Sequence, residues 1–395
     1  MKKVLLITSG NPFAPFSGEN QRTNLLLSAL LQYYTVDIVC FTDDEYPHEI
    51  LQHCNIVYWG SKSQIKHTRL KKIKYFFKHS LDSYYWVDKR YKSAVDSILK
   101  SNHYEFIMVR YIRNVCFCGL ETSSNIIVDV DDLPEEVLAS STYVGTLRNI
   151  YYSHLLKKIN VSTTKFLSRI KHSFFSNPNQ CTYPHSSYLP NIPYIQKGIV
   201  DDIPFSSRKN IILFVGFLAY YPNYSGLNYF ITNIWENVLK RIPDAELRIV
   251  GKGLPEEYLD SWKKYSGISI LGYVQDLMEE YKKCKVAIVP IYAGGGSNIK
   301  VLEAMSLKRP CVVSKFATRG FEEFLKDGRN IYIAENAEDF AGKIVNLLNS
   351  SDMNSLITEN AYDVIKQHYS FQAFSNYLMK GINDALQSLQ NENKE

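Results

Sequence analysis

The sequence predicts an α/β protein made of two Rossmann-like domains, each built on a doubly wound parallel sheet. Two observations lead to this prediction. With 395 residues, the chain is long for one hydrophobic core and suits two domains of roughly 150 to 200 residues each. Short apolar runs alternate with stretches of helical periodicity along both halves. This βα alternation is typical of a parallel sheet covered by helices on both faces.

The N-terminal half contains five apolar runs that predict strands. They lie at residues 3–8, 35–41, 55–59, 105–109 and 126–131. Between them, the spacing of apolar residues predicts helices that include 21–32 and 94–100. The sequence therefore favours a first parallel sheet with long insertions between its strands.

The C-terminal half shows the same alternation with shorter connections. Strands are predicted at 211–216, 247–251, 268–271, 286–291, 311–314 and 330–333. Helices are predicted at 225–242, 276–283, 299–306, 319–325 and 337–349, with a last helix at 371–389. Ligands of such sheets bind beyond the carboxyl ends of the strands, so the loops at these ends are the first candidates for a site.

One of these loops, residues 294–305, joins a run of glycines, a cation and a carboxylate across a strand-to-helix turn. Glycine lets the backbone approach a ligand closely, and the N–H groups of a helix N-terminus near Ser297 and Asn298 attract anions. Lys300 lies in the first helical turn, where a cation is unfavourable unless an anion is also present. Glu303 shares its helix face. The loop predicts a nucleotide diphosphate site, and a plain connection is the alternative.

Residues 286–305 resemble the nucleotide-sugar site of retaining GT-B glycosyltransferases of glycosyltransferase family 4. The pattern of that family runs from a strand ending in proline, through a glycine loop, to Lys-x-Leu-Glu-Ala-Met. Segments that resemble the donor domain of the family in the same order are 214–216 with 222–223, 247–251, 271–274 and 310–313. The resemblance implies a GT-B fold whose two domains face an interdomain cleft.

The resemblance also implies the division of the chain. Residues 1–195 would form the acceptor-binding domain, with a C-terminal helix at about 370–390 that crosses back to it. Residues 196–369 would form the domain that binds the nucleotide-sugar donor. A Pro-Asn pair at 190–191 resembles the signature that ends the first domain, which places the linker near 192–208.

The activity implied is transfer of a sugar, with retention, from a nucleotide-sugar to a glycan or lipid-linked glycan in surface polysaccharide or glycoconjugate biosynthesis. No metal and no cofactor are expected, because family members stabilise the leaving diphosphate with helix dipoles and cations. Lys300 and the amides of residues 296–298 are expected to do so here, while Glu303 holds the ribose. The expected donor-binding residues are Gly18, Arg22, Gly216, Gly251, Tyr273, Val274, Gly295, Gly296, Ser297 and Asn298.

Two sites are predicted in the N-terminal half. The loop 9–22 resembles the opening loop of the family, in which a glycine near Gly18 approaches the donor phosphates and Arg22 follows at the family spacing; a proline-rich surface loop is the alternative. Three carboxylates, Asp129, Asp131 and Asp132, lie at the end of a predicted strand. One of them, with Asp131 and Asp132 as the candidates, is expected to orient the acceptor hydroxyl or contact the donor sugar. Binding of Mg²⁺ and a solvated turn are the other interpretations, and the resemblance argues against the metal.

Two departures from the family pattern affect the donor site. Many members have a glutamate at the position of Gly295, and an arginine and a lysine where this chain has 217–223, a stretch rich in aromatic residues. Lys300, with Arg22, is then the main cation expected on the phosphates. A non-catalytic GT-B subunit that binds a partner or a glycan is the alternative function, and a sugar epimerase is a third.

Charge and cysteine content limit the other functions that the chain could have. The net charge of +5, without an arginine-rich or zinc-knuckle pattern, argues against nucleic acid as a partner. Seven scattered cysteines favour reduced thiols in a cytoplasmic protein. Residues 62–78 contain seven Lys or Arg and no acidic residue, interleaved with apolar ones. This segment predicts either a peripheral contact with the anionic inner face of the plasma membrane or a solvated helix.

Overall fold

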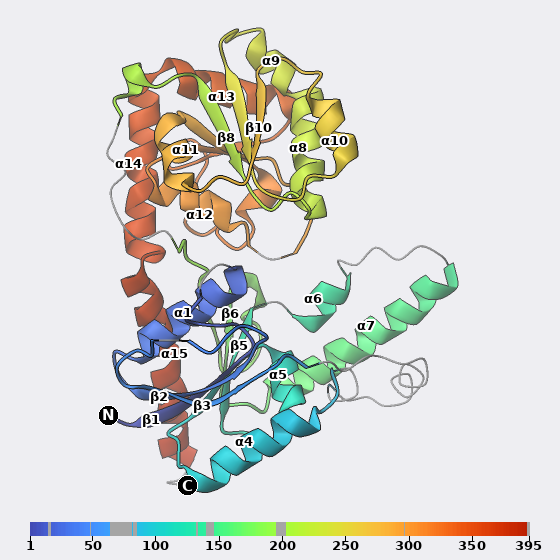
Figure 1. The fold of residues 1–395 in the computed structure, drawn as a ribbon, viewed down its shortest axis with the longest axis vertical. Helices are drawn as coiled ribbons and strands as arrows, with labels where there is room; N and C mark the ends of the chain where they lie inside the picture. Colours follow the sequence, from blue (N-terminus) through green and yellow to red (C-terminus); the bar gives the residue numbers. More distant parts are fainter. Residues whose placement is uncertain are drawn as a thin grey trace. The chain divides into compact units, whose positions relative to one another are not determined.

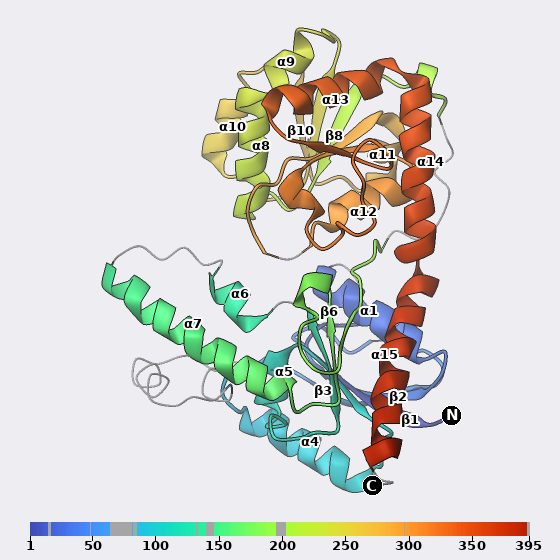
Figure 2. The same cartoon turned by 180° about the vertical axis from the view of Figure 1, so that it is seen from behind.

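The computed structural model describes residues 1–14, 17–47, 49–63, 81, 85–131, 133–139, 146–194, 203–295 and 297–392. The chain divides into two compact units, and each contains its own parallel sheet. Unit 1 consists of Met1–Pro190 and Phe374–Glu395, and unit 2 consists of Asn191–Ala373. Figures 1 and 2 show the two sheets from opposite sides.

Unit 1 contains a parallel sheet of seven strands with the order β3-β2-β1-β4-β5-β6-β7. The strands are β1 (Lys3–Thr8), β2 (Thr35–Phe41), β3 (Cys54–Gly60), β4 (Ile107–Arg110), β5 (Ile126–Asp131), β6 (His172–Phe175) and β7 (Ser186–Tyr188). Val4, Leu5, Leu6 and Ile7 are all fully buried, so β1 is covered on both faces, as its continuous apolar sequence predicts. The order reverses between β1 and β4, which makes this pair the topological switch point of the sheet.

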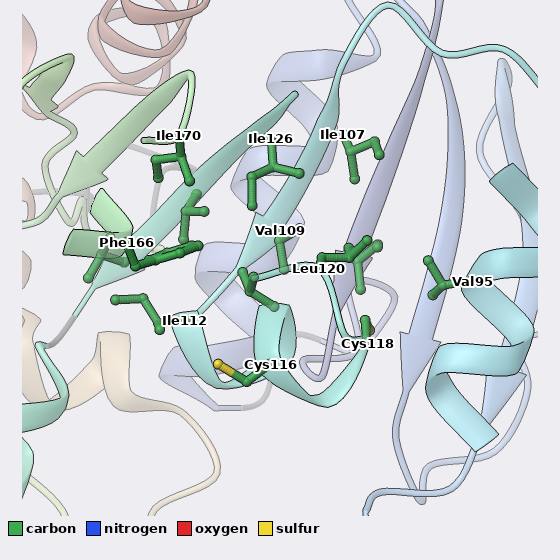
Figure 3. Packing of buried hydrophobic residues seen from close by; sticks show 14 of the residues in the cluster. Val95, Ile107, Val109, Ile112, Cys116, Cys118, Leu120, Ile126, Phe166 and Ile170 are labelled. Atoms are coloured by element: carbon green, nitrogen blue, oxygen red, sulfur yellow. The ribbon is translucent and has the colours of Figure 1, made fainter. Parts of the chain in front are cut away.

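The helices of unit 1 connect and cover these strands. They are α1 (Gly18–Leu30), α4 (Lys89–Ser101), α5 (Ile112–Phe117), α6 (Pro134–Ala139), α7 (Thr146–Leu167) and α15 (Phe371–Glu392). Helix α1 begins at Gly18 because the side chain of Ser17 accepts a hydrogen bond from the Asn20 N–H. Figure 3 shows strand residues such as Val109 and Ile126 in one buried cluster with Cys116 of α5. The core thus packs α5 against β4 and β5.

Unit 2 contains a parallel sheet of six strands with the order β10-β9-β8-β11-β12-β13. The strands are β8 (Ile211–Val215), β9 (Glu246–Val250), β10 (Ile268–Gly272), β11 (Val286–Val289), β12 (Cys311–Ser314) and β13 (Tyr332–Ala334). The helices are α8 (Tyr221–Asn233), α9 (Trp235–Leu239), α10 (Glu256–Trp262), α11 (Leu277–Lys283), α12 (Ile299–Ser306), α13 (Ala337–Asn349) and α14 (Ser351–His368). The switch point lies between β8 and β11.

The predicted fold class, two doubly wound parallel sheets, is confirmed. Two predicted helices are wrong in detail. The helix predicted at 225–242 is broken at Ile234 into α8 and α9, and the indole N–H of Trp235 donates to the carbonyl of Ser266 at 2.8 Å. The helix predicted at 319–325 is absent, because a 3₁₀ turn at Lys315–Thr318 is followed by Gly320 with a positive φ of 87°.

None of the helices that the structure describes combines the length and the apolar character needed to cross a lipid bilayer.

Candidate functional site

The carboxyl ends of β8 and β9, next to the switch point of unit 2, are packed so closely that one position requires glycine. The N–H of Gly216, directly after β8, donates to the carbonyl of Val250 at 3.0 Å. Gly251 follows β9 with φ of 152°, and a Cβ at this position would lie 1.7 Å from the carbonyl oxygen of Gly216. A larger residue at 251 would therefore push apart the two strand ends that border the loop after β8.

The glycine loop between β11 and α12 is held by a tyrosine from the loop after β8. The N–H of Gly295 donates to the hydroxyl of Tyr220 at 3.2 Å, and a Cβ on Gly294 would lie 3.0 Å from the same oxygen. A Cβ on Gly295, by contrast, would meet no atom within 4 Å. The loop is thus fixed on one side and open on the other. Gly296 lies outside the described residues.

Helix α12 begins directly after this loop. Its N-cap is Asn298, whose side chain makes no capping hydrogen bond, while the hydroxyl of Ser297 accepts from the Asn191 amide at 2.8 Å. Val301 and Leu302 face the core and are fully buried. The helix therefore presents Lys300 and Glu303, which flank these two apolar residues in sequence, on its other face.

Lys300 is a half-buried cation with one polar partner among the described residues. Its Nζ donates to Oδ1 of Asn223 at 2.7 Å, and the Nδ2 of Asn223 donates to the carbonyl of Phe217 at 2.7 Å. Burial lowers the pKa of Lys300 to about 8, although the nearby carboxylate of Glu303 opposes this change. Because burial disfavours the charged ammonium, an anion placed beside it would stabilise the charged form.

Glu303 lies on the same face of α12 and is also half-buried. Burial raises the pKa of its carboxyl group, with Lys300 opposing the shift. Among the residues that the structure describes, Glu303 and Lys300 form no ion pair within 4 Å. Each group is therefore available to a ligand that carries both an anionic part and hydroxyl groups.

The loops after β9 and β10 add an aromatic ring and a second cation. Tyr273 is 66% exposed, and the Nζ of Lys252 lies 4.0 Å from the centre of its ring. Val274 is half-buried beside it in sequence. Sequence reasoning missed Lys252, although its place directly after Gly251 was a usable signal. It also missed Arg319, whose guanidinium donates to the carbonyl of Gly294 at 3.4 Å.

In unit 1, the structure pairs Arg22 with a carboxylate of the sheet. The guanidinium of Arg22 is 3% exposed and donates to both oxygens of Asp129, at 2.6 and 2.9 Å, and to the carbonyls of Leu189 and Pro190. Arg110 also donates to Asp129. Burial opposes the charge of Asp129, but these two arginines outweigh it and lower the pKa of the carboxyl group. A contact of Arg22 with donor phosphate stays a prediction, as does the role of Gly18 at the start of α1.

Two residues with positive φ lie at the carboxyl ends of β4 and β5. Asp131 has φ of 61° and accepts a hydrogen bond from Arg110 at 3.1 Å. Tyr111 has φ of 68° and ψ of 137°, and its ring lies 4.2 Å from the guanidinium of Arg110 and 4.3 Å from that of Arg113. Such backbone costs about 1–3 kcal/mol for a residue other than glycine and is concentrated at functional sites. Asp132 lies outside the described residues.

Residues 209–350 match the family model described as Glycosyl transferases group 1. A protein of Klebsiella pneumoniae, described as an uncharacterized 44.6 kDa protein in the cps region, is 25% identical over 231 residues, which is 56% of this chain and 58% of that protein. The poly(glycerol-phosphate) alpha-glucosyltransferase of Bacillus subtilis (strain 168) is 23% identical over 210 residues, 52% of this chain and 28% of the enzyme. The chain thus spans less than two thirds of either curated relative.

The solved structure of sucrose-phosphate synthase from Thermosynechococcus elongatus has the same fold. The two align with a TM-score of 0.69 and 15% identity, over 98% of this chain and 100% of the synthase. Its likeness extends over both parallel-sheet units of the present chain. The chain therefore carries a glycosyl transferases group 1 domain at 209–350, within the two-domain fold of the GT-B glycosyltransferases.

Proposed function

We propose that this chain is a glycosyltransferase of family 4 that moves a sugar, with retention and without a metal, from a nucleotide-sugar to a glycan or lipid-linked glycan. The observation that carries the proposal is the position of Lys300. A half-buried ammonium lies at the N-terminal turn of α12, beside an open glycine loop, at the switch point of the sheet. Burial lowers the pKa of Lys300, so an anionic ligand beside it would stabilise its charged form.

The leaving diphosphate is the group that this arrangement would stabilise. When the bond between the sugar and the diphosphate breaks, negative charge grows on the phosphate oxygens. Lys300 and the N–H groups of Ser297 and Asn298 at the start of α12 are fixed before the reaction and would stabilise that charge. Glu303 would accept hydrogen bonds from the ribose hydroxyls, and the exposed ring of Tyr273 would border the base.

For the acceptor side, Asp131 is the proposed group in unit 1. Its carboxylate already accepts a hydrogen bond from Arg110, so its orientation is set before an acceptor hydroxyl arrives. The cps-region relative supports a role in surface polysaccharide or glycoconjugate biosynthesis. We propose a cytoplasmic position, with the basic segment 62–78 on an anionic membrane. Residues 64–78 of this segment lie outside the described residues.

A non-catalytic glycan-binding or partner-binding subunit is the second candidate. One observation favours it: the loop after β8 presents Phe217, which is 63% exposed, where a phosphate-binding cation is expected by resemblance. A subunit of this kind would release no nucleotide diphosphate with any pair of donor and acceptor.

The test is a thermal-shift screen of UDP, GDP, ADP and CMP and of their sugar conjugates. A nucleotide at 100 times its Kd stabilises the native state by about 2.7 kcal/mol, which is easily seen. We expect one nucleotide to raise the melting temperature of wild type and of the surface control Lys263→Ala, but not of Lys300→Ala or Glu303→Ala. If no nucleotide changes the melting temperature and no donor is turned over, the second candidate replaces the first.

A further inference from the structure

Unit 1 contains a pocket of about 700 Å³ at the carboxyl end of its sheet. Its walls come from the loop after β1, which includes Asn11 and Phe13, and from the loop after β2, which includes Asp44 and Tyr46. The volume lies within the range of about 300–1,000 Å³ that holds small ligands in proteins. None of the donor-binding residues predicted above lines this pocket.

One wall of the pocket is formed by aromatic rings that pack against a tryptophan of the sheet. The rings of Phe13 and Tyr46 line it, and both pack against Trp59 of β3, with ring centres 6.3 and 5.7 Å apart. The indole N–H of Trp59 donates to the carbonyl of Asp44 at 3.1 Å, which ties the loop after β2 to the sheet. Tyr46 is 52% exposed, so its ring is available to a ligand. Rings held in this way can stack on the apolar C–H face of a sugar.

The lining of the pocket also includes a fixed hydrogen-bond donor. Asn11 is 3% exposed; its Oδ1 accepts from the Phe13 N–H at 2.9 Å, and its own N–H donates to Oδ1 of Asn20 at 3.0 Å. The Nδ2 of Asn11 donates to no atom among the described residues, although the residue lines the pocket. Asn20 is fixed in turn, because its Nδ2 donates to the carbonyl of Ala14 at 2.8 Å. A ligand hydroxyl would satisfy the donor left on Asn11.

The described residues that line the pocket carry negative charge. They include Asp44, Glu45 and Glu49 and no lysine or arginine, and none of the three carboxylates forms an ion pair with another described residue. A phosphate or carboxylate group would meet like charges here, whereas a neutral hydroxyl group or an amine would not.

We propose that this pocket binds a non-acidic sugar unit of the acceptor, a neutral hexose or an amino sugar, and rejects acidic sugars. The inference rests on the proposed function, because it assigns the chemical class of the acceptor. The inference also assigns recognition of the acceptor sugar to a different place from Asp131. The pocket is formed by the loops after β1 and β2, whereas Asp131 ends β5.

The experiment measures binding of methyl glycosides of glucose, galactose, mannose, glucosamine and galacturonic acid to the full chain by ligand-observed NMR. We expect at least one neutral or amino sugar to bind and galacturonate not to bind. Tyr46→Ala should weaken binding roughly 2- to 10-fold, the range expected when an aromatic contact is lost. Tyr33→Ala is the matched control, since Tyr33 is 45% exposed and does not line the pocket. A variant with Asp44→Asn, Glu45→Gln and Glu49→Gln should admit galacturonate.

Three results would overturn the inference: binding of galacturonate to wild type as tight as that of the neutral sugars, absence of binding by every sugar, or equal binding in the Tyr46 and Tyr33 variants. The nucleotide thermal shift on the same variants separates this failure from that of the proposed function. If nucleotide binds and no sugar does, the pocket assignment alone fails. If sugars bind and no nucleotide does, the pocket remains and the transferase proposal fails.

Discussion

The Nζ of Lys300 lies 2.7 Å from Oδ1 of Asn223, so the cation is held at the first turn of α12 by a neutral amide and not by a carboxylate. A carboxylate at this position would raise the pKa of the lysine and compete with an anionic ligand. The amide fixes the side chain without neutralising it. The positive charge is thus positioned in advance, and burial keeps it incompletely stabilised until an anion binds.

Binding of a nucleoside diphosphate should be coupled to proton uptake by Lys300. Its pKa of about 8 lies below the ordinary lysine value of 10.5, and an adjacent phosphate should raise it. Affinity should therefore fall above pH 8, by at most tenfold per pH unit. Calorimetry at pH 8.5 in two buffers of different ionisation enthalpy measures the uptake. Lys300→Met should abolish it, and equal heats in both buffers for wild type would contradict the prediction.

The same lowered pKa predicts a change in the stability of the unliganded chain. Between pH 8 and about 10.5 the unfolded state binds more protons at this lysine than the folded state does. Stability should therefore rise with pH in this window through Lys300, and the rise should be absent in Lys300→Met. Urea unfolding of both proteins at pH 7.5 and 9.5 measures the difference. Between these two pH values the free energy of unfolding should increase in wild type relative to the variant.

Removal of one hydroxyl group should loosen the glycine loop. Tyr220→Phe deletes the acceptor of the Gly295 N–H, which costs about 1 kcal/mol, or roughly fivefold in nucleotide affinity. Tyr221→Phe is the matched control, because this neighbouring ring is 61% exposed. Titration of both variants with the nucleotide found by thermal shift tests the effect. Equal affinities for the two variants would show that Tyr220 does not position the loop.

Of two glycines in the same site, one should tolerate an added methyl group and the other should not. Gly251→Ala would place a Cβ 1.7 Å from a carbonyl oxygen at a positive φ, so we expect a loss of more than about 2 kcal/mol in the free energy of unfolding. Gly295→Ala meets no atom within 4 Å and should unfold as wild type does. Urea denaturation distinguishes them. Reduced nucleotide binding by the stable Gly295→Ala would then report contact with the ligand.

Asp129 should be the most costly carboxylate of unit 1 to remove. Asp129→Ala leaves Arg22 and Arg110 buried without their shared anion, which costs about 3–5 kcal/mol. Asp131, the partly exposed second partner of Arg110, provides the control. Because asparagine tolerates a positive φ, Asp131→Asn should lower the free energy of unfolding by about 1 kcal/mol or less.

The pH dependence of that effect follows from the lowered pKa of Asp129. The stabilisation is present above the ordinary aspartate range and is lost as the pH falls through the lower folded value. The difference between wild type and Asp129→Ala should be full at pH 6 and shrink only below about pH 4. A difference that already disappears at pH 5 would contradict the assignment.

Helices were predictable where the hydrophobic periodicity extends over several turns, and strands were predictable where both of their faces are buried. Helix α12 and strands β1, β2 and β5 have the predicted bounds because their apolar residues define them locally. Strands β6 and β7 were missed because they have four and three residues and include His172, Ser173 and Ser186. The 22-residue helix α7 was also missed.

The composition of the candidate site could be predicted in part, but its pairing could not. The glycine loop, Lys300 and Glu303 lie within one short segment, so sequence alone brought them together. The contact of Lys300 with Asn223 joins residues 77 positions apart, and that of Arg22 with Asp129 joins residues 107 apart. Nothing local encodes such pairs. The family resemblance led us to expect Arg22 at the donor phosphates, which stays a prediction, but it gave no sign of the pairing with Asp129 inside unit 1.

The return of the chain to unit 1 has a consequence for the order of events on the ribosome. Helix α15 completes unit 1 with the buried side chains of Phe374, Leu378 and Ile382, and the Ser375 hydroxyl donates to Gln32. Unit 2, Asn191–Ala373, is continuous in sequence. At about 5 to 20 residues per second, its synthesis separates the two parts of unit 1 by roughly 10 to 40 s. Unit 1 therefore receives its strands before unit 2 is synthesised and its helix α15 only afterwards.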